Sequence, residues 1–108
     1  MCEERDVLVC MSKEQSNPVE IARTVAAFTD TEHNERSTVV VYIHLERMEQ
    51  GGLVKRQEFR DPKVLPLFKL TAKGLAEKAK ALAEQPSIAS LVRQAHERVA
   101  FDTITSTQ

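Results

Sequence analysis

The chain has 108 residues, 42% of them hydrophobic and 29% charged, which is the composition of a globular protein with one small core and excludes a disordered chain. Aromatic residues make up 5% and Trp is absent, so the chain lacks the side chains of a stacking platform for single-stranded nucleic acid. No apolar run is long enough to span a membrane and the acidic start lacks a signal-peptide core, so we expect a cytoplasmic protein with no membrane partner.

Charge is unevenly distributed along the chain, although the net charge is only −1. Residues 1–35 contain three Lys or Arg against eight Asp or Glu, residues 36–69 contain seven against four, and residues 70–108 contain five against four. The surplus of positive charge in the middle segment favours contact with a polyanion there. The net charge itself argues against purely electrostatic binding to DNA.

Two helices are expected in the first third of the chain. The apolar run near the N-terminus predicts a helix over residues 4–14, although its period does not exclude a strand. Asn17 is a good N-cap and Pro18 suits the first helical position, so a second helix begins here and runs to about Phe28. The polar residues 29–36 show no periodicity and predict a loop.

A third helix follows and carries the clearest start and stop signals of the middle segment. Ser37 or Thr38 can cap its start. Gly51-Gly52 ends it, because glycine adopts the left-handed cap conformation without a Cβ clash. Its expected inward positions recur at spacings of four and three, at Val41, Leu45 and Met48.

The next segment predicts a β-hairpin. Residues 53–59 have the composition of a strand, and residues 60–63 form a turn around Pro62. Residues 64–70 return as the second strand, although Pro66 restricts that strand to an edge or a late start. The hairpin carries four basic side chains: Lys55, Arg56, Arg60 and Lys63.

Two helices complete the chain. Thr71 caps a helix that runs to Glu84, with an expected inner face of Leu75, Ala79 and Leu82. A break at Gln85-Pro86 separates it from a last helix, which runs to about Phe101. Apolar residues recur along this last helix at Ile88, Leu91, Val92, Ala95 and Val99. Because a small chain has little core to spare, we expect this stripe to meet a second copy.

A helix, a glycine stop and a basic hairpin, in that order, are typical of a winged helix-turn-helix protein. The predicted fold class is therefore α+β, mostly α, with a two-stranded β-hairpin wing. The sequence also resembles the PadR-type regulators of the MarR-like superfamily over residues 5–84. The motifs that carry this resemblance are Val41-Tyr42, Leu45, Arg47-Met48-Glu49, Gly52-Leu53-Val54, Phe68-Lys69-Leu70-Thr71 and Gly74.

The resemblance implies a homodimeric transcriptional regulator, a repressor, that binds double-stranded DNA. Its third helix would enter the major groove, its wing would touch phosphate or the minor groove, and its C-terminal helix would form the dimer contact. The expected DNA-binding residues are Arg36, Ser37, Thr38, Val40, Tyr42, Ile43, His44, Arg47, Lys55, Arg56, Arg60 and Lys63. The expected dimer interface is Ile88, Leu91, Val92, Ala95 and Val99.

These expectations divide the chain into three parts. Residues 1–84 form the winged helix-turn-helix domain, residues 85–101 form the dimerisation helix, and residues 102–108 form a disordered tail.

Two aliphatic residues depart from the family pattern. The family has polar residues at the positions of Val40 and Ile43, and aliphatic groups can contact a thymine methyl but cannot read guanine or adenine edges. Two alternatives therefore stay open. One is a winged-helix module that binds a protein partner through Val39, Val40 and Ile43. The other is a plasmid or phage partition or replication factor that binds DNA with the same elements.

Catalysis and cofactor binding are not predicted. The sequence contains no P-loop, no GxSxG, no HExxH and no glycine-rich fingerprint, so we expect no enzyme and no cofactor. Cys2 and Cys10 have no ligand cluster nearby, and His33 and His96 lack metal-ligand spacing, so no metal site is expected. Because aromatic residues are few, no small-molecule ligand is predicted, and the existence of an effector stays open.

Overall fold

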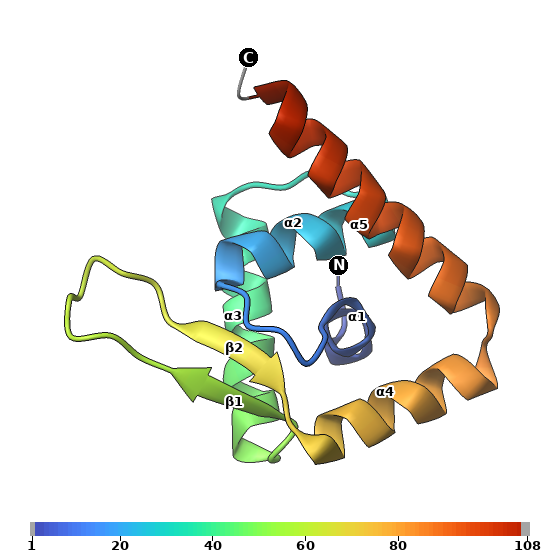
Figure 1. The fold of residues 1–108 in the computed structure, drawn as a ribbon, viewed down its shortest axis with the longest axis horizontal. Coiled ribbons are helices and arrows are strands. Elements are labelled where there is room, and N and C mark those ends of the chain that lie inside the picture. Colours follow the sequence, from blue (N-terminus) through green and yellow to red (C-terminus); the bar gives the residue numbers. More distant parts are fainter. Residues whose placement is uncertain (1, 107–108) are drawn as a thin grey trace.

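The computed structural model describes residues 2–106 of the chain, and side chains as far as residue 102. The helices and the strands of a two-stranded antiparallel sheet follow one another along the chain in the order shown in Figure 1. The elements are α1 (Glu4–Cys10), α2 (Pro18–Thr29), α3 (Glu35–Gln50), β1 (Val54–Gln57), β2 (Leu67–Leu70), α4 (Ala72–Glu84) and α5 (Ser87–Ser106). None of the described helices is both long and apolar enough to cross a membrane.

The core lies where α1, α2, α3 and the base of the hairpin meet. Its largest fully buried side chains are Phe68, Leu45, Met48, Val7, Val9 and Val41. Burial of each such side chain contributes roughly 1.5–3 kcal/mol to folding, so these residues set the positions of α3 and of the hairpin. The inward face predicted for the third helix is confirmed.

The first helix is shorter than the sequence predicted. It ends at Cys10 instead of residue 14, and the chain then runs extended along β2. The Ser16 amide donates to the Phe68 carbonyl at 2.9 Å, and the Phe68 amide donates to the Ser16 carbonyl at 2.8 Å. These non-local bonds give the backbone an alternative to helix, which a local pattern cannot reveal.

The start of α3 also corrects the prediction. Asn34, not Ser37 or Thr38, is the N-cap, and its side chain accepts the Ser37 amide at 3.0 Å. Ser37 completes a capping box, because its hydroxyl accepts the Asn34 amide at 2.9 Å. The helix therefore begins inside the segment that the sequence assigned to a loop.

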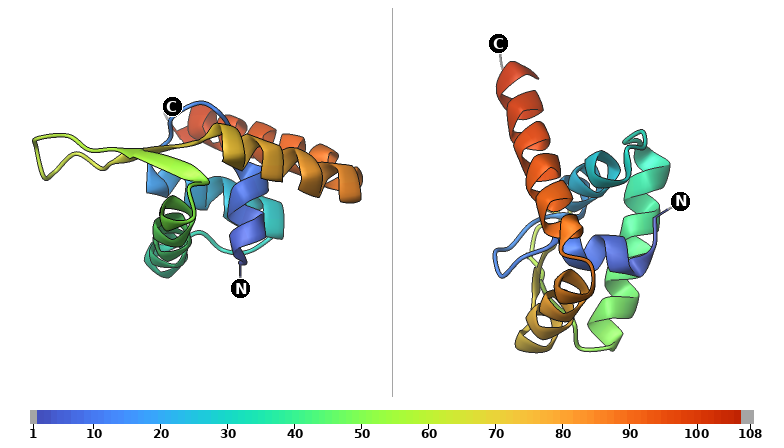
Figure 2. Two further views of the ribbon diagram at one scale, coloured as in Figure 1. Left: turned by 90° about the horizontal axis from the view of Figure 1, so that it is seen from below. Right: turned by 90° about the vertical axis from the view of Figure 1, so that its right-hand side faces the viewer.

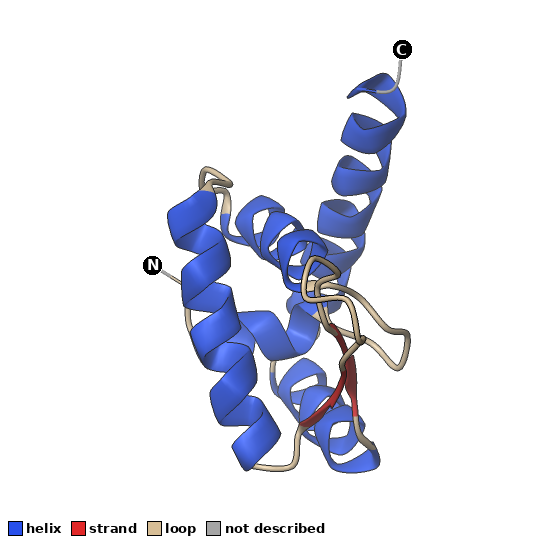
Figure 3. Cartoon of the chain, turned by 90° about the vertical axis from the view of Figure 1, so that its left-hand side faces the viewer, coloured by secondary structure: helices blue, strands red, loops and turns tan. Residues whose placement is uncertain are grey.

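The hairpin pairs Val54 with Leu70 and Arg56 with Phe68, so both strands are shorter than expected. Residues 58–66 between them form a long loop that extends away from the helical body (Figures 1 and 2). Figure 3 shows how short the red strands are beside this tan loop. We call residues 58–66 the wing loop.

The helix after the wing is rotated relative to the prediction. Leu75 is 39% exposed and Ala79 is exposed, whereas Gly74 and Ala81 are buried. Gly74 fixes this rotation, because a Cβ there would overlap the Leu53 carbonyl. Lys78 lies on the inner side and donates to the Met11 carbonyl at 2.5 Å. Tight backbone packing therefore decides which face of α4 points inward.

The last helix packs along α2. Val92 is 8% exposed and Ala95 is 3% exposed, so the chain's own α2 covers part of the stripe that the sequence assigned to a partner. The helix continues to Ser106, five residues beyond the predicted end at Phe101. The expected disordered tail is thus helical as far as residue 106, and residues 107–108 lie outside the described part of the chain.

Candidate DNA-binding surface

The outward face of α3 carries a row of exposed side chains at helical spacing. They are Arg36, Val39, Ile43, Arg47 and Gln50. Val39 is 58% and Ile43 is 45% exposed, so the centre of the row is apolar. Arg36 and Arg47 lie on one side of this centre, and Glu46 on the other. We call Arg36, Val39, Ile43, Arg47 and Gln50 the α3 row.

Several predicted site residues on α3 face the protein instead. The Ser37 hydroxyl accepts the Asn34 amide and donates to the Asn34 carbonyl, and the Thr38 hydroxyl donates to the same carbonyl. Val40 is half-buried and lines a hollow of about 340 Å³ between α2 and α3. His44 is half-buried, and its Nε2 lies 3.2 Å from the Cys2 carbonyl oxygen. The contacts of these residues within the protein hold α3 in place.

Arg56 is tied into the base of the wing. Its side chain is 17% exposed, and its guanidinium carbon lies 5.4 Å from the Tyr42 ring centroid and 5.0 Å from that of Phe68. Its Nη1 donates to the Tyr42 hydroxyl at 2.9 Å, and its Nη2 lies 3.2 Å from Glu49 Oε1. The two rings meet edge to face at 6.1 Å. Arg56 therefore joins β1 to α3.

The electrostatics of this cluster keep Arg56 charged. Desolvation acts to lower the pKa of its guanidinium, but Tyr42 and Glu49 outweigh desolvation and raise that pKa. Glu58 adds a second ion pair, 3.4 Å from Arg56 Nη1. Tyr42, expected to bind DNA, is half-buried and instead contacts Arg56 through its ring and its hydroxyl. Arg56 is thus a positioning residue for the wing.

The wing loop carries two exposed cations. Arg60 and Lys63 form no ion pair within the described residues. The Asp61 carboxylate accepts the Lys63 amide at 2.9 Å, and the Asp61 carbonyl accepts the Val64 amide at 3.0 Å, which together shape the turn. Large apolar side chains stand beside these cations: Phe59, Val64 and Leu65, each 41–46% exposed.

Lys69 is a further cation of the hairpin, outside the expected DNA-binding set. Lys69 is paired directly opposite Lys55, so both side chains leave the hairpin on the face away from Arg56 and Phe68. Lys55 is exposed and Lys69 is half-buried. The strand register brings the two lysines together, and the long loop between the strands prevented that register from being predicted from the sequence.

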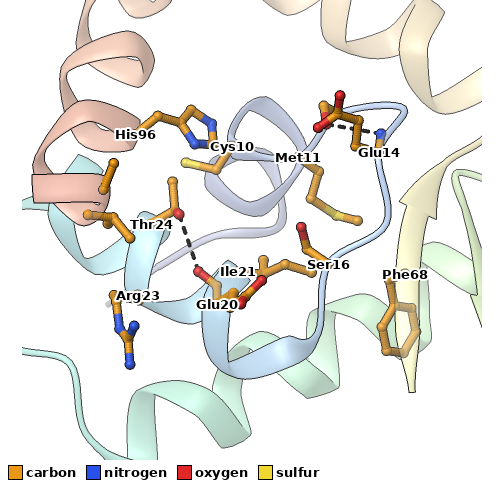
Figure 4. A pocket seen from close by; sticks show the side chains of 13 residues that line it. Cys10, Met11, Glu14, Ser16, Glu20, Ile21, Arg23, Thr24, Phe68 and His96 are labelled. Atoms are coloured by element: carbon orange, nitrogen blue, oxygen red, sulfur yellow. Dashed lines mark hydrogen bonds between the residues drawn. The ribbon is translucent and has the colours of Figure 1, made fainter. Parts of the chain in front are cut away.

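A pocket of about 270 Å³ lies on another side of the molecule, between α1, α2 and α5 (Figure 4). Its lining includes Cys10, Thr24 and His96, and the Thr24 hydroxyl donates to the Glu20 carbonyl at 3.2 Å. Burial, with a smaller effect from Asp6, raises the pKa of Cys10 to about 12, so its thiol stays protonated at neutral pH. The described residues contain no group of three His, Cys, Asp or Glu that could hold a metal.

Solved structures share this arrangement of elements. A structure of H. salinarum RosR superimposes with a TM-score of 0.64 and 21% identity, over 94% of this chain and 92% of that one. A double mutant of Lactococcus lactis ZitR in its apo form superimposes with a TM-score of 0.56 and 14% identity, over 96% and 76%. The chain has a winged-helix fold.

The comparisons go no further than the fold. RosR and ZitR are winged-helix transcriptional regulators, but the sequence identities are too low to carry their roles over to this chain. No protein-family model matches the sequence, and no curated protein matches it. The narrower resemblance to PadR-type regulators stays a prediction.

Proposed function

We propose that this protein is a sequence-specific, double-stranded DNA-binding regulator of transcription that acts in the cytoplasm as a homodimeric repressor. One observation carries the proposal: the α3 row and the wing loop each expose two arginine or lysine side chains, and none of these four cations forms an ion pair within the described residues. In a winged-helix protein α3 enters the major groove, and cations beside it meet the phosphates.

The α3 row has side chains suited to base recognition. Arg47 can bind guanine through two hydrogen bonds, and Gln50 can do the same with adenine. Val39 and Ile43 suit the methyl group of thymine. Gln50 and Val39 were absent from the expected DNA-binding set, because rotation of the helix, and not its sequence alone, brings them outward. The proposed contacts are Arg36, Val39, Ile43, Arg47, Gln50, Lys55, Arg60 and Lys63.

Repression would follow from occupancy. A protein that fills the major groove and clamps the backbone excludes polymerase from the same duplex. In a two-fold dimer the two α3 helices lie about 34 Å apart, one turn of DNA, so the operator would be a palindrome. Leu91 is the most exposed member of the predicted dimer stripe, at 48%, and it remains available to a second copy.

Charge reversal in the wing loop tests the DNA proposal. Arg60→Glu with Lys63→Glu should weaken binding to a fluorescent mixed-sequence duplex by more than about 100-fold at low salt, because two phosphate contacts become repulsive. The matched control is Lys13→Glu with Lys80→Glu, which makes the same change in net charge at exposed lysines outside α3 and the wing. Equal losses in both variants would contradict the proposal.

The dimer has its own test. Leu91→Glu should convert the protein to a monomer in analytical ultracentrifugation, because a carboxylate cannot be buried in an apolar seam. Leu75→Glu, at a leucine exposed on α4, is the control and should leave the dimer intact. A monomeric wild-type protein, or a dimeric Leu91→Glu variant, would contradict this part of the proposal.

The second candidate is a protein-interaction module. It is favoured by the exposed apolar residues at the centre of the α3 row, Val39 and Ile43. If the wild-type protein fails to bind duplex DNA at about 50 mM salt, this candidate takes precedence. Ile43→Glu would then be expected to abolish capture of a protein partner while Lys63→Glu leaves it unchanged.

A further inference from the structure

The wing loop exposes an unusual number of apolar side chains for a loop that projects into solvent. Phe59 is 41% exposed, and Val64 and Leu65 are each 46% exposed. Single exposed apolar residues are ordinary, but three in one projecting loop expose more apolar surface than a solvent-facing loop requires. Pro62 and Pro66 stiffen the same loop because each fixes its own φ, which lowers the entropy lost when the tip is ordered on a partner.

The charges of the wing loop identify the chemistry of that partner. Both acidic groups are engaged within the chain: Glu58 lies 3.4 Å from Arg56, and the Asp61 carboxylate accepts the Lys63 amide. The cations Arg60 and Lys63 have no ion pair among the described residues. The wing loop therefore presents two cations at its turn, with apolar side chains before and after them in the chain. This combination complements a groove with apolar walls bordered by phosphates.

The position of the tip relative to α3 is set by the Arg56 cluster. Arg56 contacts Tyr42 and Glu49 of α3 and the ring of Phe68 in β2, so the base of the hairpin is joined to the helix that carries the α3 row. A duplex seated with its major groove on α3 presents its neighbouring minor groove beside that helix. Apolar side chains of minor-groove proteins wedge between base pairs and unstack them.

We propose that Phe59, Val64 and Leu65 enter the minor groove and unstack one base step, while Arg60 and Lys63 contact the flanking phosphates. This inference rests on the proposed DNA-binding function. It would add to the specificity of the α3 row, whose aliphatic centre can contact thymine methyl groups only. A wedge at a fixed distance from α3 selects a flexible step, TA or CA, at that place through the cost of deformation.

The experiment measures DNA bending and unstacking with the full chain. The probe is a duplex operator selected in vitro from random sequence by the wild-type protein, labelled at both ends for energy transfer. Wild-type binding should raise transfer between the ends, because unstacking toward the major groove bends the duplex. 2-Aminopurine placed at successive positions should brighten on binding at one step only, beside the α3 footprint.

Phe59→Ala with Leu65→Ala should bind the same operator about ten-fold more weakly and should abolish both the bend and the 2-aminopurine signal. Leu75→Ala, at an exposed leucine on α4, is the matched control and should keep all three. Phe59→Leu keeps an apolar wedge and should retain most of the bend, which separates wedging from loss of fold.

The outcomes separate this inference from the proposed function. Binding with a straight duplex and no brightening would overturn the wedge and leave the DNA-binding function standing. An unchanged bend in the Phe59→Ala with Leu65→Ala variant would overturn it as well. A failure of the wild-type protein to select or bind any duplex would overturn both.

Discussion

The base and the tip of the wing use the same residue types for different purposes. At the base, Arg56 is 17% exposed and is held between Tyr42 and Phe68, beside Glu49. At the tip, Arg60 is exposed and forms no ion pair within the described residues. The base therefore stabilises the protein itself, whereas the tip is left to meet another molecule.

The strand register produces this difference. Arg56 and Phe68 are directly opposite each other, so their side chains leave the hairpin on the same face, toward α3. Pairing stops at Gln57 and Leu67, so the residues beyond have no strand partner and protrude as the wing loop. Arg56 lies within the paired strands and Arg60 lies beyond them, so two chemically identical side chains acquire different roles.

Removal of the basal arginine should have the largest effect on stability. Arg56→Ala should lower the free energy of unfolding by about 2–3 kcal/mol, because it removes cation–π contacts, a hydrogen bond and an ion pair and leaves Glu49 unpaired. Chemical denaturation measures this loss. A change below about 0.5 kcal/mol would place Arg56 in solvent and remove the distinction between base and tip.

The same substitution at the tip should act on binding instead. Arg60→Ala with Lys63→Ala should leave the free energy of unfolding within about 0.5 kcal/mol of wild type. The salt slope of duplex binding should become shallower by about two, one unit for each lost phosphate contact. A destabilised protein with an unchanged slope would show that the tip, like the base, serves the fold.

A smaller effect is expected from the tyrosine hydroxyl. Tyr42→Phe keeps the ring against Phe68 and removes only the acceptor of the Arg56 hydrogen bond at 2.9 Å. Stability should fall by about 1 kcal/mol. The double variant with Arg56→Ala should lose less stability than the sum of the two single variants, because both substitutions break the same interaction. Full additivity would argue against the contact.

The smallest effect should be a gain in stability. Lys55 and Lys69 are directly opposed on the outer face of the hairpin, and like charges in that position destabilise a strand pair. Lys69→Glu should therefore raise the free energy of unfolding by about 0.5 kcal/mol, measured by thermal denaturation, and Lys69→Met should raise it less. A loss of stability in Lys69→Glu would contradict the register.

The sequence predicted the order and type of the elements because their signals are local. Asn17 and Thr71 cap their helices as expected, accepting the amides of Glu20 and Gly74. Gly52 adopts a positive φ of 78° just after α3, as a glycine stop requires. Periodicity located Val41 and Leu45 in the core. Such signals depend on residues a few positions apart, so one sequence is enough to read them.

The rotation of side chains about the helices was harder to predict. Val40 and His44 were expected outward on α3 but are half-buried, because α2 and the N-terminal segment pack against that side. Leu75 was expected inward but is exposed, because Gly74 approaches the Leu53 carbonyl. The burial of Arg56 depends on the register of the hairpin. Each of these outcomes is decided by contacts between segments distant in sequence.

The salt dependence of duplex binding by the wild-type protein tests the central claim most directly, namely that α3 and the wing form one DNA-binding surface. Fluorescence anisotropy is followed from about 50 to 300 mM salt. The four proposed phosphate contacts per protomer, from Arg36, Lys55, Arg60 and Lys63, predict that log K falls against log salt with a slope of about −3.6 per protomer. No binding at the lowest salt, or binding that does not weaken as salt rises, would contradict the account.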